Sequence, residues 1–147
     1  MNAYLHKVQY YETDMMGVVH HANYIRWMEE ARIDFMERLG FPYAAVEAKG
    51  VVSPVTSLSC DYKRPCIFGD TMRIGVSVAG FNGVVLSLRY HMERASDGET
   101  VCEARSEHVF LNREGRFVRL RRELPEFNAL LETLAREGND HERQDHP

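Results

Sequence analysis

The residues best suited to chemistry lie in one short stretch near the amino terminus, from Asp14 to Tyr24. It reads D-M-M-G-V-V-H-H-A-N-Y, so a carboxylate, a glycine and two histidines come just before a segment with helical periodicity. The amino terminus of a helix exposes unpaired backbone N–H groups and the positive end of the helix dipole. A carboxylate facing such a terminus can attack a carbonyl whose oxygen the amides stabilise. The pattern therefore indicates acyl transfer, with Asp14 as the acid.

Other chemistries find less support in the same stretch. A metal site built on Asp14, His20 and His21 is disfavoured, because adjacent histidines point apart and no third strong ligand stands at metal-site spacing. Ser57 and Ser59 lie in no G-x-S-x-G elbow, so a serine-hydrolase reading has little support.

The elements that must position the stretch can be read from periodicity. Residues 4–10 alternate as a first strand, and residues 12–19 have no period and form a loop. From about Asn23 the apolar residues recur at helical spacing until Gly40 and Pro42 end the helix. The apolar face of this helix comprises Tyr24, Trp27, Met28, Ala31, Phe35 and Leu39.

After Gly50 the sequence pattern is that of antiparallel strands. Pro54 bends or borders a strand over 51–62, and an Asn82-Gly83 turn indicates a hairpin. A C-terminal helix is expected from Pro125. The predicted fold is α+β, one long helix wrapped by a curved antiparallel sheet, which needs further cover and so favours dimerisation through extended strands. We expect one domain over 1–137 and a disordered tail over 138–147. The predicted strands are 72–79, 85–92 and 100–112, in addition to those above.

Composition narrows the functional class. The chain has 147 residues, a formal net charge of −4 and three cysteines without CxxC spacing. The charge argues against a dedicated nucleic-acid binder, and the cysteines fit reduced thiols of a cytosolic protein. No apolar run is long enough to span a bilayer, so a cytoplasmic protein without membrane insertion is expected.

Two segments carry a resemblance to a known family. Residues 11–24, Y-E-T-D-M-M-G-V-V-H-H-A-N-Y, continue through Glu29-Glu30-Ala31-Arg32, and residues 62–70 read Y-K-R-P-C-I-F-G-D. In these segments the chain resembles hotdog-fold thioesterases of the 4-hydroxybenzoyl-CoA thioesterase family, near the YbgC-type acyl-CoA thioesterases. The resemblance covers about residues 5–122. It implies a hotdog dimer, commonly paired into a homotetramer, with active sites at the dimer interface and hydrolysis of acyl-CoA without a metal or redox cofactor.

The resemblance also implies residue roles. Asp14 matches the catalytic aspartate, acting as nucleophile or as general base, and the backbone N–H near His21 would polarise the thioester oxygen. The His21 side chain either orients substrate or water, or packs at the helix end. Gly17 either brings the loop close to ligand or serves only a turn. The remaining substrate-binding candidates are Val19 and Tyr24 beside the acyl group, with Lys63 and Arg64 at the CoA phosphates.

Alternatives remain open at this point. Lys63 and Arg64 could be merely solvated, and a second basic candidate for the nucleotide is the cluster Arg116, Arg119, Arg121 and Arg122 on an expected strand extension. Another hotdog branch uses a carboxylate within the long helix, but the loop pattern favours a structural role for Glu29 and Glu30. Hotdog dehydratases are another alternative within the fold. In them we would expect a histidine-led, proline-rich segment directly before the long helix. From another class, a non-catalytic oligomer binding acyl-CoA or acyl-carrier protein would keep the pocket without a functional Asp14.

Overall fold

The computed structural model describes residues 3–145, with side chains through Asn139. A strand and a short 3-10 turn precede the long helix, and four further strands and two helices follow a short connecting helix. In order the elements are β1 (Tyr4–Lys7), η1 (Tyr10–Glu12), α1 (Ala22–Arg38), α2 (Tyr43–Ala48), β2 (Val55–Tyr62), β3 (Thr71–Phe81), β4 (Val85–Arg94), β5 (Thr100–Val109), α3 (Leu120–Glu123) and α4 (Pro125–Asp145).

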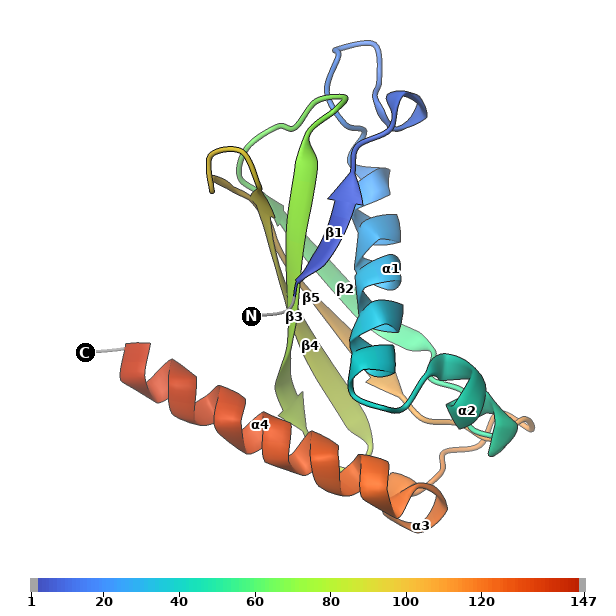
Figure 1. Ribbon diagram of the computed structural model, residues 1–147. Coiled ribbons are helices and arrows are strands. Elements are labelled where there is room, and N and C mark those ends of the chain that lie inside the picture. Colours follow the sequence, from blue (N-terminus) through green and yellow to red (C-terminus); the bar gives the residue numbers. More distant parts are fainter. Residues whose placement is uncertain (1–2, 146–147) are drawn as a thin grey trace.

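The five strands form one antiparallel sheet in the order β1-β3-β4-β5-β2. The predicted hairpin joins β3 to β4, where Gly83 adopts φ 90° and the Asn82 side chain accepts hydrogen bonds from the backbone N–H groups of Val84 and Val85. The sheet twists strongly and α1 lies along one of its faces (Figure 1). The hotdog-type α+β fold is therefore confirmed.

The core lies between α1 and the sheet. Trp27 and Ala31 of α1 are fully buried, and Met72, Ile74 and Met92 meet them from β3 and β4. The predicted apolar face of α1 is confirmed, with its last two members, Phe35 and Leu39, only half-buried. Alternation along β5 places every second side chain, from Cys102 to Phe110, in the buried layer.

Strand β2 forms one edge of the sheet, in keeping with Pro54 directly before it. Its ladder to β5 is irregular between Val55 and Ser57, and its side chains are almost all exposed. The first strand is shorter than predicted, because the chain leaves β3 after Lys7 and tightens into η1, where the Glu12 side chain accepts the Gln9 N–H.

The C-terminal half differs from the sequence prediction at one point and extends it at another. Helix α4 continues to Asp145, into the predicted tail over 138–147, and residues 146–147 lie outside the described residues. The predicted strand extension after Gly115 is wrong. Only Phe117 makes a bridge there, and Arg121 and Arg122 belong to helix α3, so the four arginines share no strand face.

Helix α4 runs across the lower part of the molecule in Figure 1 and packs against β3. Phe127 stacks on Phe41 with ring centroids 4.7 Å apart and meets the edge of Phe110 at 6.1 Å. At the other end of the contact, a Cβ on Gly138 would lie only 2.5 Å from the backbone oxygen of Val78. Gly138 therefore allows a close approach of helix to strand. In the part of the chain that the structure describes, no helix has both the length and the apolar character needed to cross a membrane.

This close approach makes a prediction with a defined sign. Alanine is favoured over glycine in a helix interior by about 1 kcal/mol, yet we expect Gly138→Ala to lower the melting temperature because a methyl group cannot fit against Val78. The measurement is thermal unfolding at fixed protein concentration, beside Glu137→Ala on an exposed position of the same helix. A stabilised Gly138→Ala protein would show that α4 does not rest on β3 at this point.

Candidate active site

The buried carboxylate of Glu12 holds together the elements that lead into the predicted site. Glu12 is only 4% exposed, and its two oxygens accept hydrogen bonds from the Gln9 N–H at 2.8 Å and from Trp27 Nε1 at 2.6 Å. His6 Nε2 lies 2.8 Å from Oε1. Burial alone would raise the pKa of this carboxyl, but the hydrogen bonds from Gln9, His6 and Trp27 outweigh burial and hold the pKa below its ordinary value. Glu12 thus ties β1, η1 and α1 together as an anion.

The loop that follows carries Asp14 at its tip. Its backbone N–H donates to Val18 O at 2.9 Å, and Gly17, with φ 79°, closes the turn by donating to Asp14 O at 3.0 Å. One carboxylate oxygen, Oδ1, accepts the Met16 N–H at 2.8 Å. Among the described residues, Oδ2 has no partner. The loop therefore holds the carboxylate by one oxygen and leaves the other available.

The same loop delivers the chain to the amino terminus of α1. His20 N donates to Glu12 O, and Asn23 N donates to His20 O. Ala22 N donates to the His20 ring at 3.1 Å, and Tyr62 OH donates to His21 O at 2.9 Å. Within residues 3–145 the His21 N–H has no acceptor, so one amide at the helix start is left for a ligand oxygen.

A groove of about 280 Å³ opens beside this helix start. It runs between the beginning of α1, the end of β2 and the turn after β2. Five of the seven predicted site residues line it, namely Val19, His21, Tyr24, Lys63 and Arg64, together with Val18, Tyr62 and Pro65. Asp14 and Gly17 are not among the lining residues and lie in the adjoining loop.

The thiol and phenol groups near the groove are uncharged at neutral pH. Burial raises the pKa of the Cys66 thiol to about 11, and Tyr24 OH lies 3.1 Å from its sulfur. Burial, followed by the Cys66 contact, also raises the pKa of Tyr24 well above its usual range. Burial and then Cys60 raise the pKa of Tyr62 to about 12. None of these groups supplies an anionic nucleophile at neutral pH. Within residues 3–139, whose side chains the structure describes, no three His, Cys, Asp or Glu side chains are grouped to hold a metal ion.

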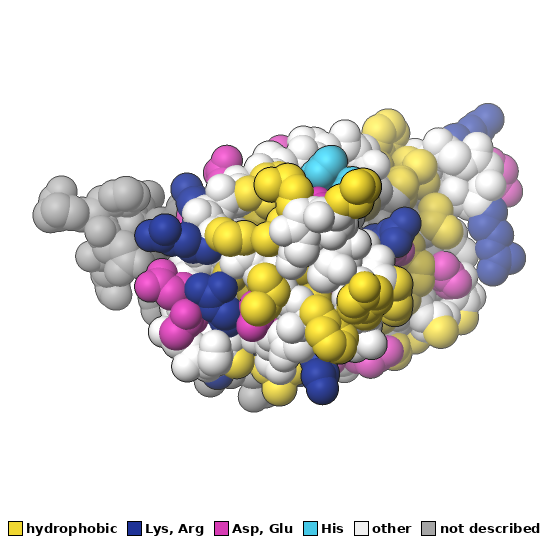
Figure 2. All heavy atoms as spheres, turned by 90° about the horizontal axis from the view of Figure 1, so that it is seen from above, with side chains coloured by type: hydrophobic (Ala, Val, Ile, Leu, Met, Phe, Trp, Pro, Cys, Tyr) yellow, Lys and Arg dark blue, Asp and Glu magenta, His cyan; other side chains and the backbone are white. Residues whose placement is uncertain are grey.

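The surface around the Asp14 loop is apolar. Figure 2 looks down on the upper end of Figure 1 and shows hydrophobic side chains gathered there, with Lys and Arg beside them. Met15 and Met16 are almost fully exposed, and Tyr10 and Phe68 meet edge to face at 5.8 Å. The patch comprises Tyr10, Tyr11, Met15, Met16, Ile67 and Phe68. Exposed apolar groups of this extent are typical of a surface that contacts a ligand or another chain.

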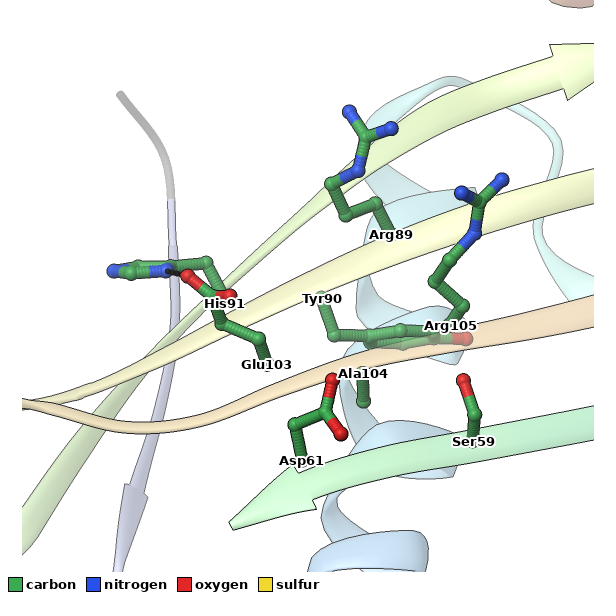
Figure 3. Close-up of a pocket in the computed structure, with 8 residues that line it drawn as sticks. All are labelled: Ser59, Asp61, Arg89, Tyr90, His91, Glu103, Ala104 and Arg105. Atoms are coloured by element: carbon green, nitrogen blue, oxygen red, sulfur yellow. Dashed lines mark ion pairs between the residues drawn. The ribbon is translucent and has the colours of Figure 1, made fainter. Parts of the chain in front are cut away.

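A cavity of about 210 Å³ on the outer face of the sheet is unrelated to the predicted site. In Figure 3, Arg89 and Arg105 project side by side from neighbouring strands, and Asp61 lies nearby on β2. His91 Nδ1 lies 3.6 Å from Glu103 Oε1. The mixture of both charge signs fits a solvated sheet face rather than a binding site for one charged ligand.

Comparison with known proteins identifies the family. The family model described as Thioesterase-like superfamily matches residues 8–134 of the chain. The chain belongs to this superfamily. It is 35% identical over 127 residues to a candidate acyl-CoA thioesterase, YneP, of Bacillus subtilis (strain 168), covering 86% of this chain and 91% of the relative. It is 30% identical over 80 residues to the acyl-CoA thioester hydrolase YbgC of Escherichia coli O6:H1, covering 54% of this chain and 60% of YbgC.

Solved structures agree with the fold. The DHNA-CoA thioesterase of Staphylococcus aureus superposes with a TM-score of 0.89 at 28% identity, covering 95% of this chain and 93% of that one. The predicted membership among hotdog thioesterases is confirmed, and so is the enzyme class, a thioester hydrolase.

Sequence reasoning missed three residues of this region. Glu12 and Tyr62 both stand inside the segments that carry the family resemblance, but nothing in the sequence signals that one is buried and the other bonded to His21 O. Glu30 is the third, because the sequence predicts a structural role for it without naming its partners. Glu30 accepts a hydrogen bond from Tyr4 OH at 3.0 Å and lies 3.0 Å from His6 Nδ1.

The Glu12 anchor makes a testable prediction. Glu12→Gln should lower the free energy of unfolding by about 1.5–3 kcal/mol, the contribution of hydrogen bonds to a charged group. A carboxyl whose folded-state pKa lies below its ordinary 4.5 stabilises the fold above that pH and loses this contribution as pH falls through the folded-state pKa. The measurement is denaturant unfolding of both proteins from neutral pH to below 4.5, where we expect the difference between them to shrink.

Glu30→Gln is the matched control, since this carboxylate also contacts His6 but its side chain is 44% exposed. Its effect should stay within about 1 kcal/mol. Equal losses in the two variants at neutral pH would contradict a special role for Glu12.

Proposed function

We propose that the protein hydrolyses acyl-CoA thioesters to the free acid and CoA, with Asp14 as the catalytic carboxylate. The observation that carries the proposal is the placement of Asp14 in a tight loop directly before the amino terminus of α1, where the His21 N–H has no acceptor among the described residues. A thioester carbonyl bound there would direct its oxygen to the His21 amide and its carbon toward the Asp14 loop. Relatives named acyl-CoA thioesterase and acyl-CoA thioester hydrolase support CoA as the carrier.

The chemistry follows from these two groups. The unpartnered Oδ2 of Asp14 either attacks the carbonyl carbon, giving a mixed anhydride that water then hydrolyses, or takes a proton from an attacking water. Negative charge develops on the carbonyl oxygen, and the helix N–H stabilises it; losing such a donor typically costs about 3 kcal/mol of barrier. The C–S bond then breaks, and CoA leaves as a thiolate that acquires a proton.

The groove supplies binding. Lys63 and Arg64 are exposed at its rim, next to His21 and Tyr62, where they can contact CoA phosphates. Val19 and Tyr24 border the reacting end, and Gly17 shapes the loop. This arrangement favours the basic pair over the arginines after Gly115, which line no part of the groove.

Assembly into dimers, and dimers into tetramers, is part of the proposal. The outer edge of β2 has no pairing strand within residues 3–145, and Val55, Leu58 and Tyr62 are exposed along it. An unpaired edge with apolar side chains is a ready template for a second copy. The groove runs beside this edge, so a second copy would border the site.

The first test is turnover of acyl-CoAs by the wild type and Asp14→Asn, followed by release of free thiol. The substitution keeps size and removes charge and basicity, so we expect kcat to fall by about a hundredfold or more with the fold intact. Asp34→Asn, which removes an equally charged side chain paired with Arg38 on α1, should leave kcat unchanged.

Two outcomes would overturn the assignment of Asp14. Turnover that survives in Asp14→Asn would move catalysis to Glu29, Glu30 or His21. Absence of turnover on every acyl-CoA, with the thioesters still bound, would favour the alternative function, a non-catalytic oligomer that binds acyl-CoA or acyl-carrier protein.

The second test addresses the basic pair. Lys63→Ala combined with Arg64→Ala should raise KM for acyl-CoA by roughly tenfold, since a charge-assisted hydrogen bond contributes about 1.5 kcal/mol. We expect kcat to change little and the effect to weaken at high salt. Thioesters of N-acetylcysteamine, which lack the nucleotide, should be hydrolysed equally well by the wild type and the double variant.

Arg116→Ala with Arg119→Ala provides the matched control, because both residues are exposed cations outside the groove. A rise in KM in this control and none in the Lys63 and Arg64 variant would place the nucleotide at the arginines instead.

A further inference from the structure

A second cavity, of about 270 Å³, lies between α1, β2 and the buried layer of β4 and β5. Apolar side chains such as Met28 and Leu58 form much of its wall. Arg32 and His108 also line it, and Nδ1 of His108 has no hydrogen-bond partner among the described residues. The groove beside His21 has no lining residue in common with this cavity.

Arg32 is a buried cation without an anion. Its residue is 7% exposed, and its guanidinium donates one long hydrogen bond, 3.4 Å, to Ser53 O and lies 5.6 Å from the Tyr43 ring centroid. Among the described residues, no carboxylate lies within ion-pair distance of it. An unpaired buried charge costs several kcal/mol. Five N–H donors with one long contact are therefore available to an anion entering the cavity.

His108 adds a neutral donor in the same wall. The residue is 1% exposed, and burial, followed by the charge of Arg32, lowers its pKa to about 4. Tyr90 OH lies 2.8 Å from Ser106 Oγ, which lies 2.7 Å from His108 Nε2. If each hydroxyl donates toward the ring, both hydroxyl protons are used and Nδ1 carries the ring hydrogen. In the opposite arrangement the ring donates to Ser106 and Ser106 donates to Tyr90. The Tyr90 hydroxyl proton then has no acceptor in this chain of hydrogen bonds. In the first arrangement Nδ1, which has no partner among the described residues, is a free donor.

Groove and cavity follow one another along α1. Tyr24 borders the groove and Arg32 the cavity, eight residues further along the helix. Eight residues rise about 12 Å, and helix side chains slant toward the amino terminus, which brings the guanidinium nearer to the helix start. An acyl group whose thioester lies at the helix start can therefore extend between α1 and β2 toward Arg32.

We propose that this cavity receives the distal end of the acyl group, and that Arg32 and His108 select acyl-CoA substrates ending in a carboxylate. This inference rests on the proposed thioesterase function. A guanidinium matches a carboxylate with two parallel hydrogen bonds, and a neutral N–H can satisfy a remaining oxygen lone pair. Glu29 also lines the cavity and opposes an anion, but it is exposed and screened by water, whereas Arg32 is buried.

The experiment compares pairs of acyl-CoAs of equal acyl length, one ending in a methyl group and the other in a carboxylate, from short to medium chains. For the wild type we expect kcat/KM to favour the carboxylate at the length that reaches Arg32, by at least about tenfold. A third arm uses an aryl-CoA with and without a phenolic hydroxyl. No preference for the carboxylate at any length, or a preference confined to the phenol, would overturn the proposal.

Variants test the residues. Arg32→Gln should abolish the preference, Arg32→Lys should retain part of it, and Glu29→Gln should increase it. His108→Phe should reduce the carboxylate preference while hydrolysis of the methyl-ended substrate persists. A preference that is unchanged in folded Arg32→Gln protein would refute the role of Arg32.

Binding separates this proposal from the proposed function. Isothermal titration of Asp14→Asn protein with each acyl-CoA pair needs no turnover. Tighter binding of the carboxylate-ended member would support the cavity even if the wild type hydrolysed nothing. Equal binding of both members, beside normal turnover of the methyl-ended substrate, would reject the cavity and leave the thioesterase standing.

Discussion

The hydrogen-bonded carboxylate of Glu12 is the interaction on which the candidate site depends. It holds β1 through His6, the turn before the loop through Gln9, and α1 through Trp27, at distances of 2.6–2.8 Å. Its main-chain oxygen accepts from His20 and from the Asn23 side chain. The Asp14 loop is thereby closed at both ends on one buried residue. Preorganisation of this kind lets a carboxylate and a helix amide act on the same carbonyl without rearrangement.

Helix α1 serves stability and function with different parts of its length. Its buried face, centred on Trp27 and Ala31, packs on β3 and supplies the core. Its first turn presents the amide of His21, and its middle turns border the cavity that contains Arg32. One rigid element therefore sets the distance between the helix start and the cavity. If both proposals hold, the length of the acyl group that fits follows from the helix rise.

The polar groups left unsatisfied inside the protein are costly, and their positions are informative. Arg32 and the Nδ1 atom of His108 face one cavity, although a core made only of apolar side chains would be cheaper. Proteins commonly keep such destabilising groups where a ligand completes them. The open edge of β2 and the apolar surface around the Asp14 loop also leave groups exposed. A partner or ligand can cover these groups.

The sequence by itself determined most of the elements and the class of chemistry, thioester hydrolysis. Helical spacing from Tyr24 onward, the Asn82-Gly83 turn and the D-M-M-G-V-V-H-H stretch identified the long helix, the hairpin and the acid before the helix, because these signals are local. Prediction from the sequence failed where segments far apart in the chain come into contact. The burial of Glu12, the pairing of Glu30 with His6, and the meeting of Arg32 with His108 arise from packing between residues far apart in the chain. Only the tertiary structure decides such features, because burial and pairing depend on which surfaces the fold brings together.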